Sequence, residues 1–167
     1  MGNIERNTFV KKQIADAILM LMKSKPFSEI SIKEITDTAQ VSRNSFYRNY
    51  VDKEDIIKQY LHILLQNWSD AYVPDETDGT KLYSSLFIHL EQNKTLYLLL
   101  KQQGLFHLFM DVFLERYGAK PELDNISAYA TAFVSYGIYG WINEWFTRGM
   151  QEPSEMMAAL LAAQSHS

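Results

Sequence analysis

The sequence contains no cysteine. This absence excludes disulfide bonds, thiolate metal sites and a cysteine nucleophile, and it is typical of proteins of a reducing compartment. Residues 1–13 are polar and charged and hold no apolar segment of the signal-peptide type. We therefore expect a cytoplasmic protein.

Motifs for catalysis and for metal or cofactor binding are also lacking. The four histidines, His62, His89, His107 and His166, show no metal-ligand spacing, and only His107 and Asp111 stand four residues apart. There is no nucleophile elbow, no phosphate-binding glycine loop and no dinucleotide fingerprint. We predict that the protein is not an enzyme and that it needs no cofactor or metal.

One uncharged segment, residues 126–143, approaches the length of a bilayer span. It is rich in Tyr, Ser, Thr and Asn, and Glu144 follows it directly. Because Tyr and Trp favour the membrane interface over the hydrocarbon centre, we interpret the segment as a helix that a soluble protein buries on most sides. No membrane partner is expected.

Charge is distributed unevenly along the chain. Residues 1–60 contain ten basic and eight acidic side chains, a net charge of +2, and the whole chain has a net charge of −4. The remaining residues therefore carry −6. A mildly basic head on an acidic body is compatible with nucleic-acid binding by the head alone.

Apolar residues recur at helical spacing throughout, without strand alternation. The pattern predicts an all-α fold of about nine helices: a three-helix head in residues 1–52 and a helical-bundle body in residues 53–167, entered through a long fourth helix. Further helices are predicted over residues 82–90, 95–101, 105–117, 124–148 and from Pro153 to residue 163. The acidic, Pro- and Gly-containing residues 74–79 predict a linker.

Two short helices in the head form a helix-turn-helix pattern. Ser31 and Glu34 have the spacing of a capping box, and Ser42 is a second N-cap after a tight turn. Phe46 and Tyr50 are predicted to face inward. Arg and Asn in the first turn of a helix can bridge base edges in the major groove. The predicted DNA-binding residues, which read bases or hold phosphates, are Ser31, Lys33, Ser42, Arg43, Asn44, Ser45, Tyr47, Arg48 and Lys53.

Residues 27–57 resemble the DNA-binding head of the TetR family of bacterial transcriptional regulators. The matching elements are Phe27, Ser31, Val41-Ser42, Phe46-Tyr47, Tyr50 and Lys53-Glu54. Gln40 departs from the pattern, since a glycine is usual there, and it has to adopt a left-handed backbone. The resemblance implies a near-palindromic DNA operator, a homodimer, and most often repression that a small effector relieves. Activation, control by a protein partner, and a helical ligand-binding domain without DNA function are the alternatives.

The body is rich in aromatic side chains, with 17 of the 22 aromatics after residue 59. This density suits a large core, and it also suits a pocket for a small apolar or aromatic effector. The predicted ligand-binding residues are Trp68, Tyr72, Phe87, Phe106, Phe109, Met110, Phe113, Phe133 and Tyr136.

The helix predicted over residues 124–148 is apolar around most of its circumference, so that a second subunit is expected to cover part of it. Small residues permit close approach of helices, and large aromatics can anchor an interface. The predicted dimer-interface residues are Ala128, Ala132, Ser135, Tyr139, Trp141 and Trp145.

Overall fold

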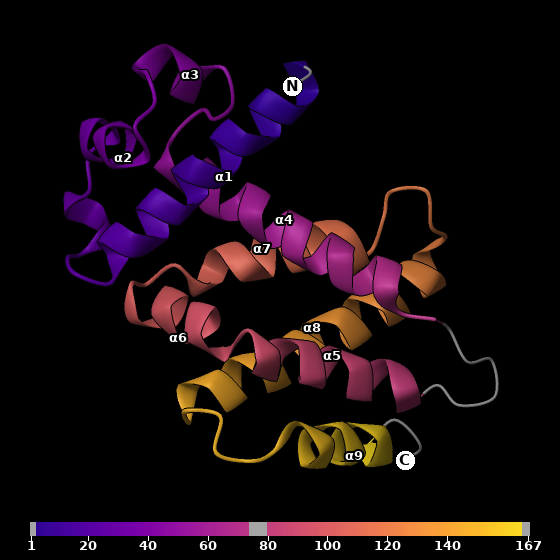
Figure 1. The fold of residues 1–167 in the computed structure, drawn as a ribbon. Helices are drawn as coiled ribbons and strands as arrows, with labels where there is room; N and C mark the ends of the chain where they lie inside the picture. Colours follow the sequence, from indigo (N-terminus) through magenta and orange to yellow (C-terminus); the bar gives the residue numbers. More distant parts are fainter. Residues whose placement is uncertain (1–2, 74–79, 165–167) are drawn as a thin grey trace. The chain divides into compact units, whose positions relative to one another are not determined.

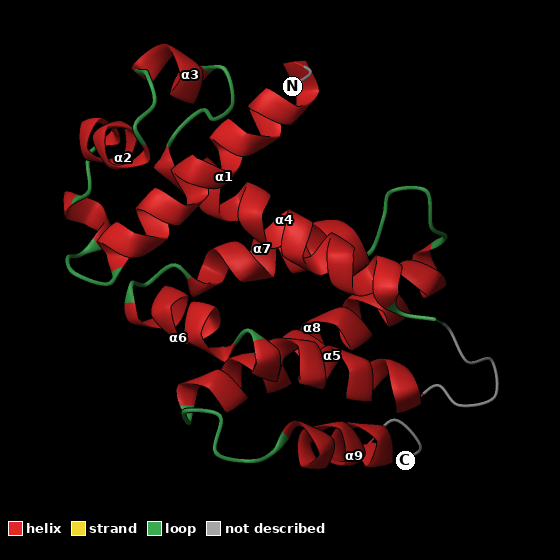
Figure 2. Cartoon of the chain, viewed as in Figure 1, coloured by secondary structure: helices red, strands yellow, loops and turns green. Residues whose placement is uncertain are grey.

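The computed structural model describes residues 3–73 and 80–164, and within these ranges every regular element is helical (Figure 2). Nine α-helices and one 3₁₀ turn, η1, follow one another along this part of the chain (Figure 1). The predicted all-α fold is confirmed. The linker predicted over residues 74–79 lies outside the described residues.

The chain forms two compact units, residues 1–63 and 64–167, and the border falls inside helix α4 (Lys53–Ala71). The first unit contains α1 (Asn3–Met22), η1 (Phe27–Glu29), α2 (Ile32–Ala39) and α3 (Arg43–Tyr47). The second contains α5 (Thr80–Gln92), α6 (Lys94–Gln102), α7 (Phe106–Tyr117), α8 (Asn125–Thr147) and α9 (Ser154–Gln164). The predicted domain border between residues 52 and 53 stays a prediction.

The first unit is built around a small apolar core in which Ile14, Ile18, Ile35, Phe46 and Ile56 are almost completely buried. Helix α1 contacts α2, and α2 contacts α3. Because α3 has only five residues, it depends on this packing far more than on its own hydrogen bonds. Phe46, the buried residue of α3, fixes that helix to the core.

Local signals set the turn between α2 and α3. Gln40 closes α2 with φ 54° and ψ 41°, the left-handed conformation that the sequence required there. The backbone N–H of Val41 donates to the carbonyl of Thr36, and this bond ends the helix. Ser42 then caps α3 by accepting a hydrogen bond from the Ser45 N–H. The predicted caps are confirmed.

The second unit has an aromatic core. Tyr97 of α6, Phe106 and Phe109 of α7 and Phe146 of α8 form ring contacts with centroid separations of 5.2–5.4 Å. Helix α5 runs along α9 (Figure 1), and the Ser154 hydroxyl at the start of α9 donates to the Glu91 carboxylate of α5. Among the described residues, no helix combines the length and the apolar character that a membrane crossing requires.

Candidate functional site

Helix α3 presents polar side chains to solvent beside its buried Phe46. Arg43, Asn44 and Arg48 are exposed, and Tyr47 is 59% exposed. Neither arginine has an ion-pair partner within the described part of the chain, so that their guanidinium donors are available to another molecule. The helix therefore offers two cations, an amide and a phenol on one short element.

The two serines of α3 have a local role. Besides accepting the Ser45 N–H, the Ser42 hydroxyl lies 3.0 Å from that of Ser45. The two hydroxyls stabilise the first turn of the helix. Each can offer a ligand only the lone pair or proton that these hydrogen bonds leave unused. Their predicted contact with DNA stays a prediction.

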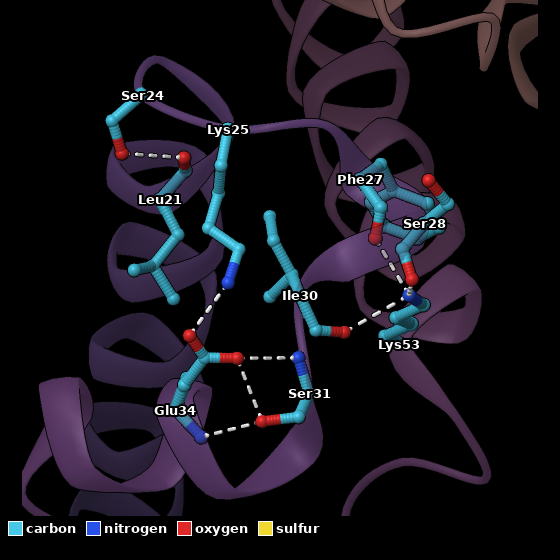
Figure 3. Close-up of polar contacts among 9 residues, drawn as sticks. All are labelled: Leu21, Ser24, Lys25, Phe27, Ser28, Ile30, Ser31, Glu34 and Lys53. Carbon is cyan, nitrogen blue, oxygen red and sulfur yellow. Dashed lines mark hydrogen bonds and ion pairs between the residues drawn. The ribbon is translucent and has the colours of Figure 1, made fainter.

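A capping box begins α2 (Figure 3). The Ser31 hydroxyl accepts from the Glu34 N–H at 3.2 Å, and the Ser31 N–H donates to the Glu34 carboxylate at 2.9 Å. The ammonium of Lys25 donates to the other carboxylate oxygen at 2.6 Å. The hydrogen bond from Lys25, followed by the backbone and hydroxyl donors of Ser31, lowers the pKa of Glu34 to about 2. The box is therefore ionised and intact at neutral pH.

Lys33 lies on the exposed side of α2, where its ammonium contacts the Asp37 carboxylate at 2.6 Å. Both side chains are largely solvent-exposed. Such pairs contribute only about 0.2–1 kcal/mol, because water solvates both charges. A phosphate can therefore replace Asp37 at little cost, and the predicted phosphate contact of Lys33 is compatible with the structure.

Lys53 is placed differently from the prediction. Its ammonium donates to three backbone carbonyls, those of Phe27 at 2.6 Å, Ile30 at 2.9 Å and Ser28 at 3.2 Å (Figure 3). It also lies 4.5 Å from the centre of the Phe27 ring. An ammonium has three N–H donors, and the protein uses all of them. The prediction that Lys53 holds a phosphate does not fit this geometry, in which it ties the start of α4 to η1.

The second unit contains an apolar cavity of about 400 Å³, within the usual size range of small-molecule sites. Residues from α4, α5, α7 and α8 surround it. Its lining consists of Trp68, Leu82, Tyr83, Leu86, Phe113, Tyr117, Ala130, Thr131, Val134, Ser135 and Ile138. Its polar groups are few, and the Trp68 N–H is already bonded to the Ser85 hydroxyl at 2.9 Å. The cavity suits an apolar ligand.

Of the predicted ligand-binding residues, Trp68 and Phe113 line this cavity. Phe87, Phe106 and Phe109 are core residues, and Tyr72 and Met110 are half-buried outside the cavity wall. Tyr136 is 54% exposed on α8 and lies outside this cavity, and Phe133, which is 82% exposed, lines a separate pocket of about 490 Å³ together with Trp141 and Leu161. Small and β-branched residues such as Ala130 and Thr131 were missed, since the prediction selected aromatic side chains.

The predicted interface residues on α8 are divided between its two sides. Trp145 is 2% exposed and donates its indole N–H to the Glu152 carbonyl, and Ser135 is buried against the cavity. Tyr139 packs on Phe106 and Phe109. These three residues face the interior of the protomer and do not fit an interface. Ala128, Ala132 and Trp141 are half-buried.

The outer side of α8 is apolar and uncovered. Its large exposed residues include Ile126, Tyr129, Phe133 and Tyr136, and a side chain at Gly137 or Gly140 would meet no described atom within 4 Å beyond the adjacent residues and backbone of α8 itself. On α9, Met156 and Leu160 are also exposed. An apolar face of this extent on a single chain is typical of a protein interface.

Metal chemistry has no support in residues 3–73 and 80–164. Nowhere in these ranges do three His, Cys, Asp or Glu side chains gather closely enough to hold a metal ion. His166, one of the four histidines of the sequence, lies outside the described residues.

Two family descriptions match the chain in the two units. The family "Bacterial regulatory proteins, tetR family" matches residues 14–60, and "Transcriptional regulator C-terminal region" matches residues 78–166. The first range contains the helix-turn-helix, and the second contains α5 to α9.

Two curated proteins are similar to the chain. An uncharacterised HTH-type transcriptional regulator of Bacillus subtilis, YxbF, is 28% identical over 79% of this chain and 39% of its own length. The HTH-type dhaKLM operon transcriptional activator DhaS of Lactococcus lactis is 24% identical over 57% of this chain and 50% of its own length. The matched part of the chain therefore spans half or less of each of these relatives.

Replacing Lys53 by Met should lower the free energy of unfolding by about 1–3 kcal/mol, because three carbonyls lose a charged donor. Urea unfolding of both variants and the parent protein measures the effect. Lys33→Met is the matched control, and its exposed ion pair predicts a loss of about 1 kcal/mol or less. If Lys53→Met keeps full stability and instead reduces the salt dependence of DNA binding by about one unit, the phosphate role is correct.

Proposed function

Because the chain belongs to the tetR family of bacterial regulatory proteins, we propose that it is a dimeric repressor that an apolar effector releases from its operator. The family and its relatives make the chain a DNA-binding transcriptional regulator. The observation that supports DNA binding by the head is the exposed, unpaired Arg43 and Arg48 at the two ends of α3. Gel shifts with the DNA upstream of its own gene test binding directly.

We assign base reading to Arg43 and Asn44, the first two residues of α3. A guanidinium can bridge guanine O6 and N7, and an amide can bridge adenine N6 and N7. Arg48, Tyr47 and Lys33 are exposed on neighbouring turns and suit phosphate contacts. Phosphate contacts position the head on DNA without reading its sequence.

The dimer is proposed to form through the outer side of α8 and the exposed side of α9. Phe133 supplies a large apolar side chain, and the open space at Gly137 and Gly140 admits a partner helix closely. A two-fold axis through such a face brings the same residues of both copies together. Two heads of a dimer match a near-palindromic operator with half-sites one helical turn, or a multiple of it, apart.

The effector is proposed to occupy the apolar cavity next to Trp68. Trp68 belongs to α4, the helix that begins at Lys53 in the other unit, so that one covalent element connects the cavity wall with the clamp on η1. A ligand releases DNA only if it binds the DNA-free arrangement more tightly, and ordinary coupling amounts to about 1–3 kcal/mol.

A second candidate function is activation, and it is favoured by the name of DhaS, a transcriptional activator. The two roles are separated by transcription in vitro from a promoter that carries the selected operator. A repressor lowers the amount of transcript and the effector restores it, whereas an activator raises the amount of transcript.

Arg43→Ala should weaken operator binding by about 1–3 kcal/mol and relax the preference at one base pair per half-site, since a bidentate base contact is lost. Binding is measured on a panel of operators with single base changes. Arg148→Ala, which removes an arginine paired with Glu144 in the other unit, should leave the affinity unchanged. Uniform weakening of every sequence by Arg43→Ala would contradict base reading.

Phe133→Arg should convert the dimer to a monomer, because an uncompensated buried charge costs about 3–5 kcal/mol at an interface. Sedimentation equilibrium at micromolar concentration reports the mass. Phe9→Arg makes the same change on α1, where Phe9 is also exposed, and should leave the dimer intact. A dimer that persists in Phe133→Arg places the interface elsewhere.

Val134→Trp should fill the apolar cavity and weaken binding of a neutral apolar probe, N-phenyl-1-naphthylamine, by at least about tenfold, or ~1.4 kcal/mol. Val134 lines the cavity and is half-exposed, so that a larger side chain can be accommodated without disrupting the core. Probe fluorescence gives the affinity. Val73→Trp, at an exposed position outside the cavity, is the matched control, and equal probe binding by both variants overturns the assignment.

A further inference from the structure

A second concave site lies on the other side of Trp68. It is a groove of about 580 Å³ formed by the last turns of α4, by α5 and by Asn93. Most of its lining is polar, in contrast to the apolar cavity. The polar lining residues are Asn67, Lys81, Ser84, Ser85, His89, Gln92 and Asn93, and the others are Leu64, Trp68, Ala71 and Ile88. All of them belong to the second unit.

His89 is the unusual residue of this groove. It is 8% exposed, and its buried Nε2 has no hydrogen-bond partner among the residues that the structure describes. The great majority of buried polar atoms in proteins are paired, so that an unpaired one is unusual and calls for an explanation. Burial lowers the pKa of His89 below its ordinary value and so favours the neutral form of the ring.

A neutral imidazole selects its partner in a particular way. Its Nε2 either donates or accepts a hydrogen bond, depending on the tautomer. A hydroxyl group satisfies both cases, because it can donate and accept. A carboxylate can only accept and an ammonium can only donate, so that each matches one tautomer alone.

The rest of the lining favours a neutral ligand as well. Among the described residues, the lining of the groove contains no carboxylate and one charged side chain, the exposed Lys81. Amides and hydroxyls from α4 and α5 supply further donors and acceptors. The indole N–H of Trp68 donates to the Ser85 hydroxyl, and the Trp68 and His89 ring centroids lie 5.9 Å apart. Trp68 therefore contributes aromatic surface to the groove and no free donor.

We propose that this groove binds a small, neutral, polyhydroxylated molecule, and that a small rotation of the His89 ring brings its buried Nε2 within hydrogen-bond distance of one ligand hydroxyl. The site is separate from the apolar cavity that the proposed function uses, although Trp68 contributes to the walls of both. It does not depend on DNA binding or on the proposed effector, and the test uses the whole chain without DNA.

The test is a titration of the protein with erythritol, a neutral polyol, followed by NMR of the Trp68 indole N–H and of the His89 ring nitrogens. Trp68→Phe assigns the indole signal. Saturable shifts of both groups are expected, with the largest change at His89 Nε2. Addition of n-butanol, which has the same carbon number and a single hydroxyl, should not reproduce these shifts.

His89→Leu should weaken erythritol binding by at least about tenfold without lowering the melting temperature, since it removes an unpaired buried nitrogen. His107→Leu makes the same change at an exposed histidine of α7 and should leave binding unchanged.

If His89→Leu fails to fold, the Nε2 shift in the parent protein decides alone. The proposal is overturned if erythritol produces no saturable shift, if n-butanol produces the same shifts, or if a folded His89→Leu binds erythritol normally. Failure of N-phenyl-1-naphthylamine to bind concerns the apolar cavity and leaves this test unaffected.

Discussion

The geometry of the DNA-binding head depends on one charged clamp. η1 and Ile30 direct three backbone carbonyls to a common point. Without a cation there these dipoles would repel one another, and among the described residues only the Phe27 carbonyl would keep a backbone donor, the Ile30 N–H. The ammonium of Lys53 fills that point and adds a contact with the Phe27 ring. Because Lys53 is also the first residue of α4, the clamp fixes the start of that helix against the turn that leads into α2. A displacement of the start of α4 would therefore act on η1 and α2 through the hydrogen bonds of Lys53.

The head was largely predictable, because its signals are local. The Ser31–Glu34 box and the Ser42 cap are hydrogen bonds within three residues, and the left-handed Gln40 follows from the tight turn after Ala39. The contacts of Lys53 were not predictable in this way, since its carbonyl partners lie 23 to 26 residues away along the chain. At the first turn of a helix, a lysine that caps carbonyls and a lysine that holds phosphate look alike in sequence. Only the fold of η1 distinguishes them.

In the body, the existence of helices was predictable and the orientation of α8 was not. An amphipathic helix reveals its inner side through its polar residues, but residues 126–143 carry no charge and are apolar around most of the helix circumference. Large aromatics were therefore assigned by size: Trp145 to the interface and Phe133 to the pocket. In the structure, Trp145 packs against Phe87 in the core, and Phe133 is 82% exposed. Most of the cavity lining beyond Trp68 and Phe113 was not predicted, because small residues such as Ala130 leave space and have no sequence motif.

The two sides of α8 give the proposed effector a route to the proposed dimer. Thr131, Ser135 and Ile138 face the cavity, while Tyr129 and Phe133, from the same turns, face outward. Protein interiors are close-packed and deform little, so that a displacement of the side of α8 that lines the cavity also moves the opposite side of the helix. A ligand that pushes α8 outward would therefore alter the surface on which the second copy rests, and the same ligand touches Trp68 of α4. If the effector binds one of two dimer arrangements more tightly, that difference in affinity is sufficient to switch DNA binding. A separate chain of contacts from the cavity to the DNA is not required.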